Sequence, residues 1–532
     1  MNWKKYKSLD MDAKKNEAFY IIGLDIGNDS SGIAYYNMAE NAPETIDLSG
    51  GYGKPSIPTV MQYISETKEW VFGEYAVLNR GAGTEITLSA LIERLGHFDY
   101  IDVDHKSVSV AAVLALFIKE ILSSVKNINP KAEIVGIVAT VPAYFSEQAH
   151  EEFQRAFKHA GYEKELISLV ADRECVLANH YRSVPENNEK TLLLDFGSRE
   201  LRGGLYEIKP NAQDIIATSM SSVFDDEIST SKINKDVTDM FAGFVFSNVK
   251  TTNQTQQLNE HISAFTYQHK DMIFQKNITQ KPIKLYFNFA YPPFQQAVDN
   301  AQAQELIRPY AARFDRFIND VLQKSLYESE VKTEDITTVL CVGGGFEMLW
   351  AKAAINKIFS KEQTHFYKNP KMTTAEGAAI VAAKALNAPG TTLNEDALPQ
   401  LKIEDKHQLT NDIGISHNNT FLPLVERNAF WWQKHISKLI LINQEVTGEL
   451  SFNITERSPT GKNHNLGTVL LEGLPTRPKG TTRLEVGVSF ASNIELTLSV
   501  KDKGFGDLFP QVDYEQVVGV TRAFGLGDLQ GR

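Results

Sequence analysis

Two short segments of the chain place an aspartate and a glycine two residues apart, directly after an apolar run. The first reads "IIGLDIGNDSSG", with Asp25 and Gly27, and the second reads "TLLLDFGSRE", with Asp195 and Gly197. Each pattern predicts a buried strand that turns back through small polar residues into a second strand. The backbone N–H groups of such turns form an anion-binding nest, and carboxylates at the strand ends orient waters around a hard cation such as Mg²⁺. The pair therefore predicts two loops that face each other across a cleft and clamp a polyphosphate.

A triple glycine follows a third apolar run, in "TTVLCVGGGFEML", before an amphipathic helix that extends to Phe359. The backbone of Gly343 to Gly345 can lie against a nucleotide at this helix start. Close packing of a helix on a strand requires glycines for a different reason, because they leave room between two backbones. Taken alone, this element favours the packing explanation.

Length and charge narrow the classes of function. The chain has 532 residues, which is enough for two or three domains that each have their own core. It carries 54 Lys and Arg residues against 66 Asp and Glu residues, for a formal net charge of −12. Because no basic surface is implied, nucleic acid is not an expected partner.

The cysteines and the first residues indicate the compartment. Cys175 and Cys341 both lie in apolar, structured stretches, so we expect core thiols in a reducing environment. The first residues are charged and lack the apolar core of a signal peptide, and no later stretch is apolar for long enough to span a bilayer. The expectation is a soluble cytoplasmic protein with no membrane partner.

The first part of the chain, residues 19–388, alternates short apolar strands with longer helical stretches, as α/β proteins do. Examples are the helix expected from Ser109 to Val125 and the strand expected from Glu133 to Val141. Residues 389–407 combine proline, glycine and polar residues, a composition that suits a linker.

The second part, residues 408–502, shows strict alternation of apolar and polar residues instead. This period of two predicts antiparallel strands with one buried face, in a β-sandwich. The expected strands read "ELSFNIT", "GTVLLEGL", "RLEVGVS" and "IELTLSV". Residues 503–532 are punctuated by glycine and are expected to form a tail.

These segments, in this order, resemble the actin-like ATPase superfamily, and specifically the 70-kilodalton heat-shock (DnaK-type) chaperones. The likeness covers residues 19 to 502. In the first part it is carried by "IIGLDIGNDSSGIA", "VATVPAYFSEQAHEEFQRAFKHAGYE", "LLLDFGS", "VLCVGGGFEML" and "NPKMTTAEGAAIVAAKAL". In the second part it is carried by "LTNDIGIS", "LPLVERN", "NLGTVLLEGLPTRPKGTTRLEV" and "LTLSVKDK". The second set is the most specific, because other actin-fold proteins lack such a domain.

The resemblance implies an α/β actin-like two-lobed ATPase domain followed by an antiparallel β-sandwich domain. It implies a molecular chaperone in protein folding that binds ATP or ADP with Mg²⁺ between the lobes. Its expected partners are unfolded or extended apolar peptide segments, bound in the β-domain, and co-chaperones. The family's helical lid needs far more chain than Lys501 to Arg532, so a divergent member without the lid is expected.

The resemblance also assigns roles to individual residues of this chain. The catalytic residues would be Asp25, Asp172 and Asp195, and Asp25 and Asp195 would hold the metal through water. Nucleotide binding falls to a larger set: Gly27, Asn28, Asp29, Ser30, Gly197, Ser198, Arg199, Lys270, Gly343, Gly344 and Gly345. Peptide binding falls to four apolar residues, which form the sandwich core in the alternative interpretation: Phe421, Leu439, Leu450 and Phe452.

Both phosphate loops depart from the family pattern. Asn28 and Asp29 replace two threonines, and the second loop reads Gly-Ser-Arg-Glu, ending at Glu200, instead of Gly-Gly-Gly-Thr. Asp29 and Glu200 each bring negative charge near a γ-phosphate, at a Coulomb cost on the order of a few kcal/mol at an effective dielectric of about 20. Two features would relieve this cost: Asp29 could cap its own hairpin, and Arg199 could contact phosphate or pair with a carboxylate.

Other positions of the family's site are also changed. Asp172 stands where the family has glutamate, and Lys371 stands where the closing helix has aspartate. The family's catalytic lysine has no counterpart between Gly81 and His105, although Arg94 is nearby. The departures predict weak nucleotide binding and weakened or lost ATP hydrolysis, and they leave open whether the chain is an ATPase.

Two other functions fit parts of the pattern. A pseudo-ATPase adaptor or scaffold would keep the architecture and lose the nucleotide site. A small-molecule kinase of the same superfold would explain the lobes, but it leaves the segment from Leu409 to Val500 without a role.

Overall fold

The computed structural model of the chain divides into two compact units, residues 1–404 and residues 405–532. The structure describes residues 19–37, 39–49, 53–79, 85–96, 100–142, 145, 147–163, 167–249, 255–274, 282–386, 399–405, 412–417, 420–426, 435–457, 463–490 and 495–521. Most of the expected linker and the last residues of the expected tail lie outside these ranges.

Lobe I of the first unit is built on a mixed sheet with the strand order β11-β10-β1-β2-β3, and β4 pairs with β2. Strands β1, β10 and β11 run parallel, whereas β2 and β3 continue the sheet in antiparallel fashion. The bounds are β1 Phe19–Ile26, β2 Ser30–Asn37, β3 Ala42–Thr45, β4 Ser56–Pro58, β10 Glu133–Val141 and β11 Ile167–Ala171. Strand β10 has the predicted bounds, and its nearly continuous burial explains its apolar sequence.

Lobe II repeats this arrangement with the strand order β18-β17-β12-β13-β14-β19. Strand β12 takes the place of β1, with the parallel strands β17 and β18 on one side and the antiparallel strands β13 and β14 on the other. The bounds are β12 Glu189–Phe196, β13 Leu201–Asn211, β14 Asp214–Asp225, β17 Thr338–Val342, β18 Thr364–Phe366 and β19 Leu401–Asp405. The predicted duplication of the lobe is confirmed.

Two helices, α5 (Asp172–His180) and α10 (Thr373–Leu386), lie between the two sheets. Helix α10 packs on β1, β2 and β10, while α5 packs on the lobe II sheet, and the two helices contact each other. The contacts are close enough to require glycine: a Cβ on Gly23 would lie 2.2 Å from the Ala375 carbonyl oxygen, and one on Gly377 would lie 1.8 Å from the Cys175 carbonyl oxygen.

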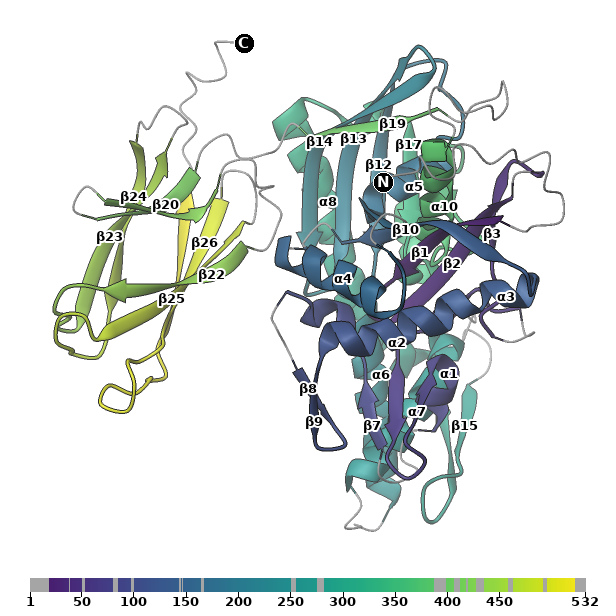
Figure 1. Ribbon diagram of the computed structural model, residues 1–532, viewed down its shortest axis with the longest axis horizontal. Helices are drawn as coiled ribbons and strands as arrows, with labels where there is room; N and C mark the ends of the chain where they lie inside the picture. Colours follow the sequence, from purple (N-terminus) through teal and green to yellow (C-terminus); the bar gives the residue numbers. More distant parts are fainter. Residues whose placement is uncertain are drawn as a thin grey trace. The chain divides into compact units, whose positions relative to one another are not determined.

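The outer face of the lobe I sheet is covered by α2 (Val110–Ser123) and α4 (Glu147–His159), which cross in front of the sheet in Figure 1. Helix α2 begins where the sequence predicts, because the Ser109 hydroxyl accepts a hydrogen bond from the Ala112 amide at 3.3 Å. Smaller elements complete the lobe: α1 Gly73–Leu78, α3 Val125–Ile128, the 3₁₀ helix Leu91–Arg94, β5 Met61–Ile64, β6 Glu69–Phe72, β7 Glu85–Leu88, β8 Tyr100–Val103 and β9 Lys106–Ser109.

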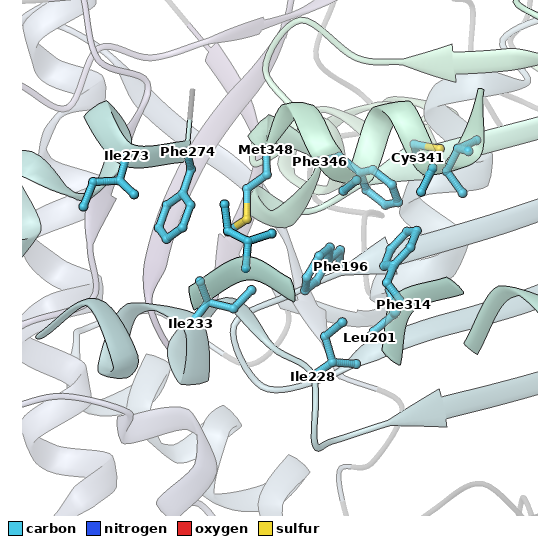
Figure 2. Packing of buried hydrophobic residues seen from close by; sticks show 14 of the residues in the cluster. Phe196, Leu201, Ile228, Ile233, Ile273, Phe274, Phe314, Cys341, Phe346 and Met348 are labelled. Carbon is cyan, nitrogen blue, oxygen red and sulfur yellow. The ribbon is translucent and has the colours of Figure 1, made fainter. Parts of the chain in front are cut away.

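The outer face of the lobe II sheet is covered by helices that share one aromatic core. Figure 2 shows Phe196 of β12 beside Phe314 and Phe346, with ring centroids 5.7 and 6.1 Å from that of Phe196. The elements are α6 Thr230–Asn248, α7 Thr255–Phe274, α8 Asn300–Ser329, α9 Leu349–Ile355, β15 Ile283–Phe287, β16 Phe294–Val298 and the 3₁₀ helices Thr333–Asp335 and Gly344–Glu347. Because Phe196 directly precedes Gly197, this core fixes the start of the turn Gly197 to Glu200.

The second unit consists of two four-stranded antiparallel sheets, ordered β21-β20-β23-β24 and β22-β25-β26-β27. The bounds are β20 Asp412–His417, β21 Thr420–Val425, β22 His435–Ile442, β23 Glu449–Arg457, β24 Asn463–Glu472, β25 Thr482–Phe490, β26 Glu495–Asp502 and β27 Glu515–Thr521. All four expected strands are present, so the predicted antiparallel β fold is confirmed.

The second unit extends past residue 502, where the sequence analysis ended the β-domain. Strand β27 pairs with β26 along its whole length, so part of the expected tail is an edge strand. The connection before it is fixed by the buried pair of Arg477 and Asp502, whose nearest atoms are 2.6 Å apart. Asp502 also accepts hydrogen bonds from the amides of Gly504 and Val512. These long-range contacts could not be read from the tail's own composition.

Both cysteines are buried and free, as expected for core thiols. Among the described residues, no helix has the length and apolar character needed to cross a membrane.

Candidate functional site

A cleft of about 160 Å³ lies between lobe I and lobe II. A single buried water needs only roughly 10–15 Å³, so the cleft has room for a larger polar group. The turns Gly27 to Ser30 and Gly197 to Glu200 both reach it, as does the first residue of α5. The lining residues are Asp25, Ile26, Gly27, Asn28, Asp29, Ser30, Ile92, Thr140, Pro142, Asp172, Asp195, Gly197, Ser198, Arg199, Glu200, Arg202, Thr230, Gly343, Gly344, Pro370, Lys371 and Thr374.

The two loop hairpins, hairpin 1 (Phe19 to Asn37) and hairpin 2 (Glu189 to Asn211), close in the same way. In hairpin 1 the Gly27 amide donates to the Ser30 carbonyl at 3.1 Å, and in hairpin 2 the Gly197 amide donates to the Glu200 carbonyl at 3.0 Å. Strands β1 and β12 also share one pattern of burial, in which the aspartate is the partly open residue near the strand end. The sequence correctly predicts both hairpins.

Three carboxylates meet at the floor of the cleft. Asp25 and Asp195 come from the two strand ends, and Asp172 begins α5. Burial raises the pKa of Asp25 to about 6, which a 2.5 Å hydrogen bond from the Thr140 hydroxyl opposes and the charge of Asp172 reinforces. Burial also raises the pKa of Asp195 to about 7, reinforced by Asp172 and opposed by Arg202. Burial therefore makes Asp25 and Asp195 hold their protons closer to neutral pH than exposed aspartates do.

Arg202 stands among these carboxylates, directly across the β12–β13 strand pair from Asp195. Its Nη1 lies 3.3 Å from the Asp172 carboxylate, and its Nε donates to Glu200 at 3.1 Å. Nη2 also pairs with Glu200. Burial alone lowers the pKa of the guanidinium, but Glu200 and Asp172 raise it above its usual value. The charge of Glu200 is thus neutralised within its own hairpin, by Arg202.

The side chain of Asn28 binds Glu93 of the 3₁₀ helix Leu91–Arg94. Its amide group donates to the Glu93 carboxylate at 2.9 Å, and its oxygen accepts from the Glu93 amide at 3.1 Å. Ile92, from the same helix, also lines the cleft. The two hydrogen bonds therefore tie the loop of hairpin 1 to this helix.

Asp29 has no such partner within its hairpin. Its backbone carbonyl accepts from the Thr59 amide at 3.0 Å, but within hairpin 1 no amide donates to its side chain, so the predicted cap is not formed. The charge of Asp29 helps to raise the pKa of Lys371, which lines the same cleft. Lys371 itself forms a 3.0 Å ion pair with Glu347. The Asp29 side chain therefore lines the cleft without a hydrogen-bond partner inside hairpin 1.

The triple glycine divides between two roles. Gly343 and Gly344 line the cleft, whereas a Cβ on Gly345 would lie 2.1 Å from the ring of Phe196. Gly345 is thus a packing residue. Lys270 lies outside the main cleft and lines an adjoining cavity of about 30 Å³ with Asp29, Asp271, Phe274, Glu347 and Lys371.

The four predicted peptide-binding residues lie in the second unit and are not equivalent. Leu450 and Phe452 are 5% and 7% exposed, so they form the sandwich core, which was the alternative interpretation. Phe421 is half-buried beneath the guanidinium of Arg457, 5.4 Å from its ring centroid. Leu439 is 56% exposed on β22 and is the member of the set that is open to a partner.

Two family models and several curated proteins match the chain. A model described as "Family of unknown function (DUF5716) C-terminal" matches residues 42–282, and one described as "Domain of unknown function (DUF8552)" matches residues 406–517. Similar curated proteins carry the description "Chaperone protein DnaK". That of Thermosipho africanus (strain TCF52B) is 22% identical over 92% of this chain and 79% of that protein.

Two more curated proteins are similar to this chain over most of its length. The "Chaperone protein DnaK" of Thermosipho melanesiensis is 23% identical over 93% of this chain and 80% of that protein. The one of Prochlorococcus marinus (strain MIT 9515) is 22% identical over 96% of this chain and 79% of that protein. Two lobes with matching strand orders around a cleft, followed by antiparallel sheets, form the α/β two-lobed domain and β-domain that the sequence resemblance implies. This chain is a distant homologue of the DnaK-type, 70-kilodalton heat-shock chaperones.

Sequence reasoning missed Arg202 and Thr140, which contact the floor carboxylates. The signal for Arg202 was available, because a turn closed between Gly197 and Glu200 places Arg202 opposite Asp195 in an antiparallel pair. Thr140 gave no such signal, because it reaches Asp25 across a parallel pair formed 115 residues apart.

Proposed function

We propose that this chain is a DnaK-like chaperone whose cleft binds ATP or ADP with little or no hydrolysis and whose second unit binds extended apolar peptide. One observation supports nucleotide binding above the others: both loops, the start of α5 and the Gly343 and Gly344 turn line a single cleft. Turns with open backbone amides favour phosphate groups, and bare glycines admit a flat ring against the backbone.

Slow hydrolysis follows from the charges around the phosphate loops. Phosphoryl transfer needs positive groups on the transferred phosphate. Among the described residues that line the cleft, the single lysine is Lys371, and Glu347 already pairs with it. Arg202 is held by Asp172 and Glu200. Lys371 and Arg202, two of the three cationic side chains in the described cleft lining, therefore share their charge with protein carboxylates, which leaves less of it for the transferred phosphate. The third cationic side chain is Arg199.

Calorimetric titration with ADP tests the binding site. Gly344→Leu would fill the cleft, and its neighbour there is the flexible end of Lys371, so the fold should survive. We expect at least about a tenfold loss of affinity. Gly243→Leu is the matched control, because nothing lies within 4 Å of a Cβ at that position of α6. Equal affinity in both variants would place the ligand elsewhere.

A turnover assay tests the second half of the proposal. We expect wild-type ATP hydrolysis at the level of the buffer control. Robust turnover by the wild type that Asp195→Asn abolishes would contradict the proposed loss of hydrolysis and restore an ordinary ATPase cycle.

Edge strand β22 of the second unit supports peptide binding. Leu439 and Leu441 are 56% and 53% exposed, and alternation along the strand places them on one face. Strand β22 pairs only with β25 among the described strands of its sheet, so its other edge can accept an extended chain. Apolar side chains of the peptide would then lie against the two leucines.

Fluorescence anisotropy with a labelled apolar heptapeptide tests this surface. The double variant Leu439→Asp, Leu441→Asp should weaken binding by about tenfold or more. Leu470→Asp, at a 46% exposed leucine of the other sheet, is the control. If the double variant and the control bind alike, peptide does not use β22.

The adjoining cavity favours the alternative of an adaptor that has lost its nucleotide. At about 30 Å³ it has space for only a few waters, and the Lys371–Glu347 pair crosses it. A nucleoside next to the phosphate loops would have to displace this pair. The ADP titration decides between the two functions, because an adaptor would show no heat of binding under any condition.

A further inference from the structure

Hairpin 2 carries its own positive charge at the point where the two loops meet. The Arg202 side chain is only 17% exposed and connects Asp172 with Glu200. It also lowers the pKa of Asp195, its cross-strand neighbour. One guanidinium therefore forms ion pairs with Asp172 and Glu200 and stabilises the charged form of Asp195.

The same carboxylates do not fit a divalent cation. Mg²⁺ requires near-octahedral oxygen ligands and keeps several waters. Among the described residues, no group of three acidic, histidine or cysteine side chains is arranged to hold a metal ion. Oxygens of Asp172 and Glu200 are already taken by Arg202, whose charge would repel a dication at contact distance. Arg202 also lies across the strand pair from Asp195, so its charge would repel a dication held through water between Asp25 and Asp195.

We infer that Arg202 replaces the divalent cation, so that the cleft binds a nucleoside di- or triphosphate without metal. This inference rests on the proposed nucleotide binding and specifies its cofactor requirement. The guanidinium is permanently charged and planar, and it suits phosphate oxygens as well as carboxylates.

The donor inventory of Arg202 leaves capacity for a ligand. A guanidinium has five N–H donors. In the described contacts, Nε and the two Nη atoms each donate toward a carboxylate. The N–H groups that are not used there can bind a phosphate oxygen, while the carboxylates hold the planar group in position. A fixed guanidinium needs no metal to arrive with the nucleotide.

Calorimetric titration of the full chain with ADP, in EDTA and in excess Mg²⁺, tests the inference. We expect dissociation constants that agree within about threefold. Binding that is tighter by about tenfold or more with Mg²⁺ would overturn the inference and leave the proposed function standing. Absence of binding in both buffers would contradict the proposed function itself.

Substitution of Arg202 provides a second test of metal-independent nucleotide binding. Arg202→Met should bind ADP at least about tenfold more weakly in EDTA, and Mg²⁺ should restore much of the loss because the freed carboxylates can then hold it. Arg202→Lys keeps the charge and should keep metal independence, even if the Met variant fails to fold. Arg313→Met is the matched control, because Arg313 pairs with Asp225 on α8 and β14 outside the cleft lining. An unchanged metal response in Arg202→Met would overturn the assignment.

Discussion

Hairpin 1 and hairpin 2 differ at the residue that faces their aspartate across the strand pair. Asp25 pairs with Gly32, whereas Asp195 pairs with Arg202. The backbones close alike, through a glycine amide and the carbonyl three residues on. Hairpin 2 neutralises its acidic loop residue internally, but hairpin 1 leaves Asp29 to a lysine that is shared with Glu347. Two hairpins with the same backbone geometry can thus differ in how their acidic side chains are neutralised.

Exchange of one residue between the lobes should have the largest effect. Counting back from the aspartates, Gly23 of β1 matches Leu193 of β12, and Gly23 lies against α10. Gly23→Leu should reduce the free energy of unfolding by more than about 3 kcal/mol, because the backbone of α10 cannot yield. Urea denaturation measures it. The reverse truncation, Leu193→Ala, should cost about 2–5 kcal/mol through a cavity. Wild-type stability of Gly23→Leu would show that the lobes pack alike.

Stability should fall as pH rises through the range in which the floor carboxylates titrate. The pKa of Asp195 is about 7 and that of Asp25 about 6, both above the unfolded value of 3.8. Between the unfolded and the folded pKa of each group, the folded state binds more protons than the unfolded state. The free energy of unfolding therefore decreases as pH rises from about 4 to about 7. Asp195→Asn should be more stable than wild type by roughly 2 kcal/mol or more at a pH of about 8 and equal to it at a pH of about 4.

Asp25→Asn should gain less stability than Asp195→Asn, because the pKa of Asp25 is raised less than that of Asp195. Thermal unfolding across the same pH range measures both variants. A larger gain for Asp25→Asn than for Asp195→Asn would mean that Arg202 offsets more of the burial cost of the Asp195 charge than the Thr140 hydroxyl offsets for Asp25.

The loop carboxylates should differ in their effect on ligand affinity. Asp29→Asn removes a charge without a partner in its hairpin and should tighten ADP binding by about tenfold. Glu200→Gln should change it less, because Arg202 already neutralises Glu200. Asp239→Asn makes the same charge change on the exposed face of α6 and controls for net charge. Titration of the three variants in one buffer ranks them, and equal gains for both loops would remove the proposed asymmetry.

The smallest effect concerns the first polar residue of each loop. Asn28→Ala loses two hydrogen bonds to Glu93 and should cost about 1 kcal/mol of stability. Ser198→Ala, at the matching position of hairpin 2, should stay within about 0.5 kcal/mol, because Ser198 is held through its backbone carbonyl by the Ser231 amide. Urea unfolding of the pair checks this, and similar losses would contradict it.

Local patterns were sufficient for the elements and for the two loops. Strand β10 was predicted to the residue because its apolar run is buried on both faces, and the Asp-Gly spacing located both hairpins. Long-range contacts were not predictable in the same way. Alternation placed Leu450 and Phe452 on one face, but it could not say that this face is the core. The pairing of Arg477 with Asp502 likewise depends on how two sheets meet.

Strand β19 has a practical consequence for anyone who divides this protein. Residues 401–405 occupy the open edge of the lobe II sheet beside β14, and the Ile215 amide donates to the Gln400 carbonyl at 2.8 Å. A fragment that stops at residue 388, where composition suggests a boundary, would leave that edge without its partner. Exposed edges recruit other chains, so such a fragment should self-associate. A fragment carried through residue 405 keeps β14 paired with β19, as in the full chain, and it is the form of the first unit to use for titrations in isolation.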